Sequence, residues 1–277
     1  MNRTALAGIV ALVLVNSVDA RAQAPSADWT GFYLGGHAGY QWAHANVTTP
    51  SGAFPITLPP CCAFGYPSFS SHTALTLNKG VGGVLGGFNV QPAAWLLLGF
   101  EVDASWGGRG GSAAFSFFDP VTGGTGSFAL QTRIDWSASM RARFGFAQGP
   151  WLFYATSGIS FLRIGLSGAG STSAVIDICG DGCLATASTL TNFSFGKTQP
   201  GFIVGGGIEH LLAGGWILRL EYLFADYGKV DFGSVAIVSS YFDRTGCRCT
   251  VTSVTTGQPT EGLFTSSLRF AISKKIP

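Results

Sequence analysis

Eight segments of alternating apolar and polar residues follow one another along the chain, and the connections between them alternate strictly between long and short. The segments span about 31–43, 77–91, 94–107, 131–147, 150–166, 197–210, 214–227 and 263–275. Three connections are tight, and four are long, at about 44–76, 108–130, 167–196 and 228–262. Period-2 alternation is typical of β-strands with two different faces. In an up-and-down antiparallel sheet, this order puts all long connections at one end and all tight turns at the other.

The two faces of the predicted strands differ in chemistry. In the segment 131–147, Met140 and Phe144 lie on one face, and Arg141 and Arg143 lie on the other. Charged residues make up only 11% of the chain, against roughly 25% in ordinary soluble domains. Beyond the first residues, no apolar run reaches the ~20 residues that a membrane-spanning helix needs. We therefore predict an all-β fold, an eight-stranded antiparallel up-and-down transmembrane β-barrel with four long extracellular loops.

Aromatic residues near the strand ends support this orientation of the faces. Rings at the ends of spanning strands form girdles at the two membrane interfaces. The candidates are Trp42, Trp95, Trp106, Trp136, Trp151 and Trp216. The strand 150–166 fits less well, because Trp151, Phe153 and Phe161 fall on the face assigned to the lumen.

The N-terminus has the pattern of a secretory signal peptide. Arg3 precedes an apolar stretch, and Ala20-Arg21-Ala22 resembles a signal-peptidase site, which predicts cleavage between Ala22 and Gln23. An N-terminal anchor helix is the alternative. We expect residues 1–22 to be the signal peptide and residues 23–277 to form the outer-membrane barrel domain. The mature chain would carry 14 basic and 13 acidic residues, a balance that gives no support for a nucleic-acid partner.

Charged residues at inward positions are the first candidate functional group. They are Glu101, Asp103, Arg133, Asp135, Arg141, Arg143, Glu209, Arg219, Glu221 and Arg269. An eight-stranded barrel has an interior that side chains can fill, and unpaired ions there would be costly. We expect an ion-pair network that plugs the lumen, and a narrow, gated ion pathway is the alternative.

All six cysteines fall in the predicted long loops: Cys61, Cys62, Cys179, Cys183, Cys247 and Cys249. An exported chain meets an oxidising compartment, so disulfides are expected. Fifteen pairings are conceivable for six cysteines, and pairing between loops is favoured because neighbouring cysteines bridge each other with strain. A metal or redox role is the alternative, but tetrahedral zinc spacing and nearby histidines are missing. We expect no metal and no cofactor.

Histidines and serines do not suggest an active site. His37, His44, His72 and His210 lack a recognisable nucleophile and orienting carboxylate in the sequence pattern. We expect no catalytic residues and no enzymatic activity.

Several motifs together resemble strands of one family. The motifs are Trp29-Thr30-Gly31-Phe32-Tyr33-Leu34-Gly35-Gly36-His37-Ala38-Gly39-Tyr40, Ser139-Met140-Arg141-Ala142-Arg143-Phe144-Gly145-Phe146 and Leu220-Glu221-Tyr222-Leu223-Phe224-Ala225-Asp226-Tyr227-Gly228. The family that they resemble is that of the RopB-like small outer-membrane proteins of alphaproteobacteria. The resemblance implies an OmpA-like transmembrane barrel, often described as porin-like or as a surface antigen. The C-terminus departs from the pattern, since Lys274 and Ile276 stand where aromatics are usual and Pro277 is extra.

The sequence thus predicts a structural barrel that is anchored in the bacterial outer membrane and displays its loops. A narrow porin-like channel for ions or small solutes and a loop-mediated adhesin are the alternatives. The expected partners are outer-membrane lipid and lipopolysaccharide, the outer-membrane assembly machinery and a surface ligand of the loops, with no nucleic acid.

Overall fold

The computed structural model describes residues 27–49, 55–57, 63–65, 71–107, 110–119, 124–177, 184–232, 238–243 and 260–276. Eight long antiparallel strands form a closed ring: β1 (Gly31–Thr49), β4 (Ser71–Ala93), β5 (Leu96–Trp106), β7 (Gly124–Gln148), β8 (Trp151–Asp177), β9 (Leu184–Leu211), β10 (Trp216–Asp231) and β12 (Thr260–Ile276). Each strand pairs with its neighbours in sequence order, and the pairing of β1 with β12 joins the first strand to the last. The predicted up-and-down ring is confirmed, and the signal-peptide prediction lies outside the described residues.

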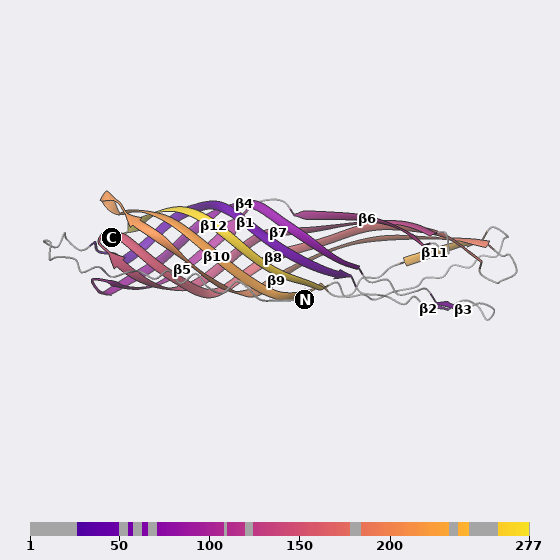
Figure 1. Cartoon of the computed structure of the whole chain (residues 1–277), viewed down its shortest axis with the longest axis horizontal. Helices are drawn as coiled ribbons and strands as arrows, with labels where there is room; N and C mark the ends of the chain where they lie inside the picture. The colour runs from indigo at the N-terminus through magenta and orange to yellow at the C-terminus, as the bar shows by residue number, and fades with distance from the viewer. Residues whose placement is uncertain are drawn as a thin grey trace, which may run out of the picture.

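Three tight turns join strands at one end of the ring (Figure 1). The first two are Ala94–Trp95 and Gly149–Pro150, where Gly149 has a left-handed φ of 58° that favours glycine. The third is the 3₁₀ turn η1 (Ala213–Gly215), which contains two glycines with positive φ. Because outer-membrane barrels have short turns at the periplasmic end, this end is the periplasmic one.

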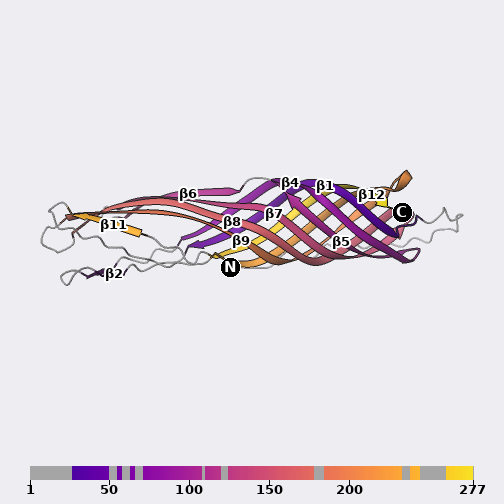
Figure 2. The same ribbon diagram turned by 180° about the vertical axis from the view of Figure 1, so that it is seen from behind.

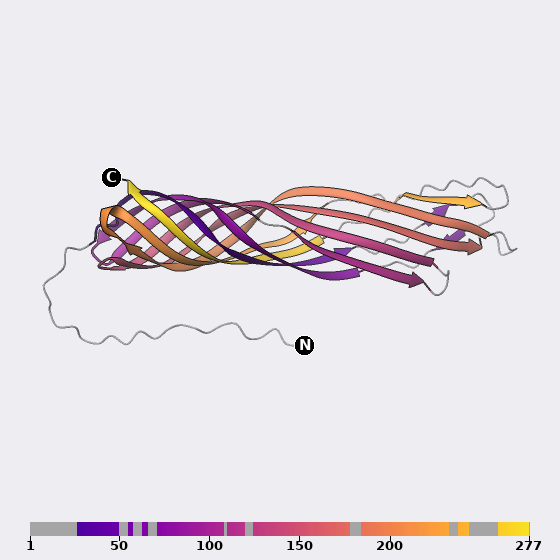
Figure 3. The ribbon, with the colours of Figure 1, turned by 90° about the horizontal axis from the view of Figure 1, so that it is seen from above.

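At the other end, paired strands continue far beyond the ring (Figures 1 and 2). β8 and β9 stay in register up to the pair Asp177–Leu184. β6 (Gly111–Asp119) pairs with β7, and β11 (Val238–Asp243) pairs with β9. A short hairpin of β2 (Pro55–Thr57) and β3 (Ala63–Gly65) lies in the same region. We call the extended parts of β7, β8 and β9, together with β6 and β11, the outer sheet. Figure 3 shows these strands from above.

The outer sheet corrects the predicted loop boundaries. Much of 108–130 and 167–196 is strand rather than loop. The sequence 167–196 is rich in Ser, Thr, Ala and Gly, which pair well as backbone but show little contrast between apolar and charged faces. A search for that contrast therefore ends the strands too early.

Apolar side chains cover the outside of the ring. Phe144, Leu220 and Phe270 are 59%, 50% and 56% exposed in the isolated chain. Apolar side chains at such positions of an outer-membrane barrel contact lipid. Trp151, Phe153 and Phe161 are also exposed, so their predicted inward position is wrong and the strand β8 follows the same rule as the others. Among the residues that the structure describes, no helix is long and apolar enough to cross a membrane.

The interior of the ring is packed in three layers. At the periplasmic end lies an apolar layer of Trp29, Tyr33, Leu85, Leu97, Ala147, Leu152, Tyr154, Ile217 and Ala271. At the extracellular end lies a larger apolar layer that includes Leu77, Leu130, Ile134, Leu162, Ile164, Leu166, Ile203, Leu223, Val230 and Leu263. Between them the inward positions are polar or charged, as the sequence Ala271, Arg269, Ser267, Thr265, Leu263 along β12 illustrates.

Candidate functional site: the charged layer of the lumen

Eight buried charged side chains from five strands meet in the middle layer, and we call them the lumen network. β5 supplies Glu101 and Asp103, β7 supplies Arg141 and Arg143, and the others are Glu209, Arg219, Glu221 and Arg269. Each is at most 7% exposed. The period of two along each strand places them on the inward face, between lipid-facing residues such as Phe100 and Met140.

Glu101 is the centre of the lumen network. Its carboxylate accepts from Arg141 Nη2 at 2.5 Å and from Arg219 Nη2 at 2.6 Å. Arg143 Nη1 lies 3.6 Å away, and the hydroxyl of Tyr33 donates a hydrogen bond of 2.6 Å. Both carboxylate oxygens are therefore satisfied by charged or hydroxyl donors, as a buried charge requires.

Glu209 and Glu221 bind other guanidinium N–H groups of the same three arginines. Glu209 accepts from Arg143 Nη2 at 2.5 Å and from Arg219 Nε at 2.6 Å. Glu221 accepts from Arg141 Nη1 at 3.0 Å and from the hydroxyl of Tyr154 at 2.7 Å. The carboxylates thus link three arginines into one continuous group.

The ring of Tyr154 also contacts the network from the side. The Arg143 guanidinium lies 4.1 Å from the Tyr154 ring centroid and 5.5 Å from that of Tyr33. A cation above an aromatic face is attracted by the ring quadrupole. The two tyrosines therefore fill the space beside the arginines and stabilise their charge.

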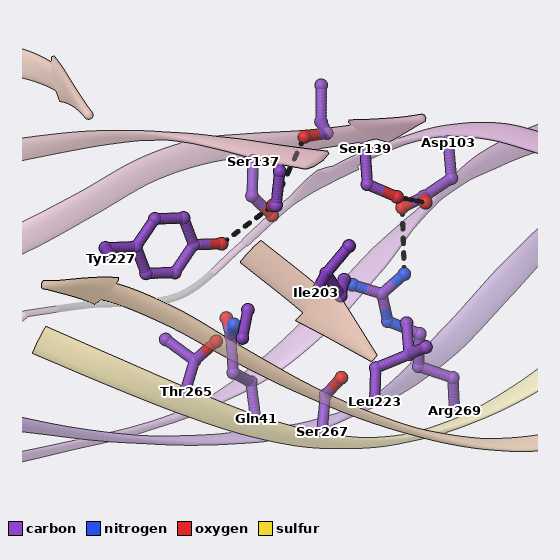
Figure 4. A pocket seen from close by; sticks show the side chains of 13 residues that line it. Gln41, Asp103, Ser137, Ser139, Ile203, Leu223, Tyr227, Thr265, Ser267 and Arg269 are labelled. Atoms are coloured by element: carbon purple, nitrogen blue, oxygen red, sulfur yellow. Dashed lines mark hydrogen bonds and ion pairs between the residues drawn. The ribbon is translucent and has the colours of Figure 1, made fainter. Parts of the chain in front are cut away.

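Asp103 connects the network to a small polar cavity on its extracellular side (Figure 4). Arg269 Nη1 lies 2.8 Å and Arg141 Nη2 3.1 Å from the Asp103 carboxylate, and Ser139 donates a hydrogen bond to it. The cavity is lined mostly by hydroxyl and amide groups, including Gln41, Ser137, Ser160, Tyr227, Thr265 and Ser267. The hydroxyl groups of Tyr227 and Ser160 lie 2.8 Å apart and form a hydrogen bond.

The lumen network is balanced in charge. It contains four arginines and four carboxylates, so these eight groups together carry no net charge when all are ionised. Mutual pairing of this kind offsets the cost of removing the eight charges from water.

Two of the ten predicted network residues lie elsewhere. Arg133 and Asp135 pair with each other at 2.7 Å, and their side chains are 70% and 33% exposed. The reason is a β-bulge: the register of β7 against β8 shifts between Ile134 and Trp136. One extra residue exchanges the two faces of a strand, so Ile134 faces inward and Arg133 outward.

The sequence prediction also missed important members of the interior. Tyr33 and Tyr154 stand at inward positions of β1 and β8. The sequence prediction had the faces of the strand 150–166 exchanged, so that Tyr154 fell on the side assigned to lipid. Trp29 precedes β1 and is nevertheless 2% exposed, which no alternation pattern indicates. The six candidate disulfide cysteines lie outside the described residues, so their pairing stays a prediction.

The geometry therefore defines a class: a closed transmembrane barrel with lipid-facing apolar strands and a filled lumen. The chain matches the family model of the outer membrane protein beta-barrel domain over residues 8–241, and it belongs to this family. The protein is located in the outer membrane.

Relatives support the same conclusion. The chain is 29% identical over 228 residues to the 31 kDa outer-membrane immunogenic protein of Brucella melitensis, covering 81% of this chain and 83% of the relative. It is 26% identical over 209 residues to the 22 kDa outer membrane protein of Rhizobium leguminosarum bv. viciae, covering 75% and 69%. The predicted membership of a small outer-membrane barrel family with alphaproteobacterial relatives is confirmed.

The chain is also similar to solved outer-membrane proteins. Neisserial surface protein A matches with a TM-score of 0.35 and 13% identity, covering 89% of this chain and 98% of that chain. Ail, the attachment invasion locus protein of Yersinia pestis, matches with a TM-score of 0.28 and 8% identity, covering 85% and 99%.

Proposed function

We propose that the protein is a non-conducting structural barrel that anchors in the outer membrane and displays the outer sheet at the cell surface. The observation that carries this proposal is the order of the layers inside the ring. An apolar layer lies on each side of the lumen network, so an ion would have to cross two packed apolar layers and a charged layer whose eight members are all in ion pairs.

The periplasmic apolar layer is completed by a residue outside the ring strands. Trp29 packs among Leu97, Leu152 and Ile217. Its backbone N–H donates to Gln91 Oε1 at 3.0 Å, which ties the segment before β1 to the turn end of β4. Lys275 holds the same segment through the Asp28 carboxylate at 2.8 Å. The indole of Trp29 therefore closes the periplasmic mouth.

The extracellular apolar layer comes from the parts of the strands just beyond the polar cavity. Leu77, Leu162 and Leu263 belong to three different strands and are each at most 1% exposed. Transferring an unpaired ion into such surroundings costs several kcal/mol or more, and apolar constrictions also exclude water. These layers support a closed lumen against the alternative of a narrow channel.

Solute uptake into liposomes tests the proposal. The purified, folded protein is reconstituted in liposomes, and swelling in small sugars and amino acids is followed by light scattering, with an open porin as positive control. We expect swelling no faster than in protein-free liposomes. Swelling that falls with solute radius would instead establish the porin-like alternative.

Display of the outer sheet is the second part of the proposal. The Brucella relative is named as immunogenic, and we propose that the strands beyond the ring are likewise accessible from outside. Antibodies against residues 184–195 should label intact cells, and labelling only after the outer membrane is disrupted would contradict this. We also propose that the outer sheet binds a surface ligand. We propose no enzymatic activity, and turnover of labelled lipid substrates by the folded barrel would contradict this.

A further inference from the structure

Two arginines that the lumen network does not use lie on the outside of the barrel, on adjacent strands. Arg133 of β7 and Arg163 of β8 are both exposed. The β-bulge described above turns Arg133 outward, so the bulge brings it to the same face as Arg163. Neither residue contributes to the lumen.

The guanidinium groups of the two arginines converge on a pair of glycines. Arg133, Gly165 and Gly196 are cross-strand partners in one row, because Arg133 pairs with Gly165 and Gly165 pairs with Gly196. A Cβ atom on Gly165 would lie 3.8 Å from Nε and Nη2 of Arg133. A Cβ atom on Gly196 would lie 3.1 Å from Nη2 of Arg163. The glycines carry no side chain, so both guanidinium groups can lie directly against the backbone of these two strands.

These two glycines, which we call the floor, lie where the outer surface changes from apolar to polar. The third outward-facing row from the floor toward the periplasm consists of Met140, Ile159 and Phe202, which pair across the same three strands and are 51%, 55% and 56% exposed. The row on the far side of the arginines is Gln131, Ser167 and Ser194. The arginines therefore stand at the boundary of the apolar belt, at the level of Trp136, which pairs with Arg163.

We propose that Arg133 and Arg163 bind the phosphate group of an outer-leaflet glycolipid over the Gly165–Gly196 floor. Guanidinium groups match phosphate oxygens with paired N–H donors, and basic residues at the membrane boundary bind lipid head groups. The ion pair of Asp135 with Arg133 Nε, at 2.7 Å, orients the Arg133 guanidinium. The site rests on the outer-membrane placement in the proposed function and is independent of whether the lumen conducts.

Titration of the full-length folded protein in detergent micelles with purified lipopolysaccharide tests the site, with affinity measured by microscale thermophoresis. The double variant R133Q/R163Q should bind about thirtyfold more weakly at low salt, at roughly a factor of five for each basic residue. R133K/R163K should lie between, because lysine keeps the charge and loses the paired donors. The matched control K229Q removes one exposed positive charge on β10 and should bind as the unmodified protein does.

The outcomes separate a lipid phosphate site from its alternatives. Lipopolysaccharide whose phosphates have been removed by a phosphatase should bind to the unmodified protein as weakly as intact lipopolysaccharide binds to R133Q/R163Q. Equal binding of intact and dephosphorylated lipid would overturn the proposal, as would an equal loss in K229Q. Inorganic phosphate that binds as tightly as the lipid would overturn the lipid as its source. Heat-modifiable gel migration confirms that each variant is folded, and liposome swelling reports on the closed lumen separately.

Discussion

Removing one charge from the lumen network should destabilise the barrel strongly. In Glu101→Gln the side chain keeps its size, but four arginines then face three carboxylates in a closed space. Glu101 is 0% exposed and binds Arg141 at 2.5 Å and Arg219 at 2.6 Å. Breaking a buried ion pair by removing one partner costs about 3–5 kcal/mol, because the other charge stays buried. We expect a loss of this size in the free energy of unfolding.

The chain offers a matched control in the exposed ion pair of Arg133 and Asp135. In Asp135→Asn a carboxylate is likewise replaced by its amide, but the two side chains of this pair are 70% and 33% exposed. Exposed pairs are worth about 0–1 kcal/mol because water screens them. The difference between the two variants therefore isolates the effect of burial.

Urea unfolding in lipid vesicles, followed by tryptophan fluorescence, measures both variants. A second substitution makes the test more specific: Arg219→Met in the Glu101→Gln background restores the charge balance. The double variant should lose less than the sum of the single losses, by about 1–3 kcal/mol. Two results would refute the ion-pair network. One is a loss of unfolding free energy in Glu101→Gln that lies within about 1 kcal/mol of the loss in Asp135→Asn. The other is a double variant whose loss equals the sum of the two single losses.

Three further predictions follow from packing, chain continuity and ionisation. Gly207→Ala would place a Cβ atom 2.5 Å from the Leu220 carbonyl oxygen and 2.7 Å from the Tyr154 hydroxyl and should cost about 1–3 kcal/mol in urea unfolding, whereas Gly80→Ala meets nothing within 4 Å and should be close to neutral. Replacing residues 168–193 by Asn-Gly should leave a heat-modifiable barrel, because Ser167 and Ser194 are paired and a two-residue turn can join them. The hydrogen bond from Lys275 lowers the pKa of the Asp28 carboxyl below its ordinary 3.8, so its contribution to stability is present above about pH 4 and is lost as the pH falls through the lowered pKa.

Each of these predictions has a result that contradicts it. Equal losses in the two glycine variants would show that both the Leu220 backbone and the Tyr154 side chain can move away from the added Cβ atom. Loss of the heat-dependent shift in the shortened protein would mean that the ring needs the outer sheet to fold. A pKa of Asp28 at or above 3.8 in a carbon-detected NMR titration would show that Lys275 does not stabilise the ionised Asp28 carboxyl.

Strand alternation predicted the ring well wherever the two faces differ strongly. Along β10, Leu220 and Tyr222 face lipid while Arg219 and Glu221 face the lumen, and this contrast is visible in the sequence. The alternation of long and short connections then gave the order of the strands. Both follow from local chemistry with a period of two.

Three features could not be predicted because they depend on pairing rather than on residue type. The bulge in β7 changes the face of Arg133 through a shift against β8. The outer sheet is built from small residues whose strand pairing has no apolar-charged contrast. The apolar layers of the lumen occupy positions such as Leu97 and Leu152, which in the sequence look like additional lipid-facing residues.

Single-channel recording in planar lipid bilayers tests the central claim, a lumen closed by two apolar layers around a neutral ion-pair network, most directly. Folded protein, verified by its heat-dependent gel migration, is added to a bilayer in 1 M KCl at roughly ±100 mV, and high salt favours detection of any pathway because it weakens surface electrostatics. We predict a current that stays at the baseline of the empty bilayer. Stable, ohmic current steps whose size changes in Glu221→Gln would contradict the closed lumen and establish a conducting path through the network.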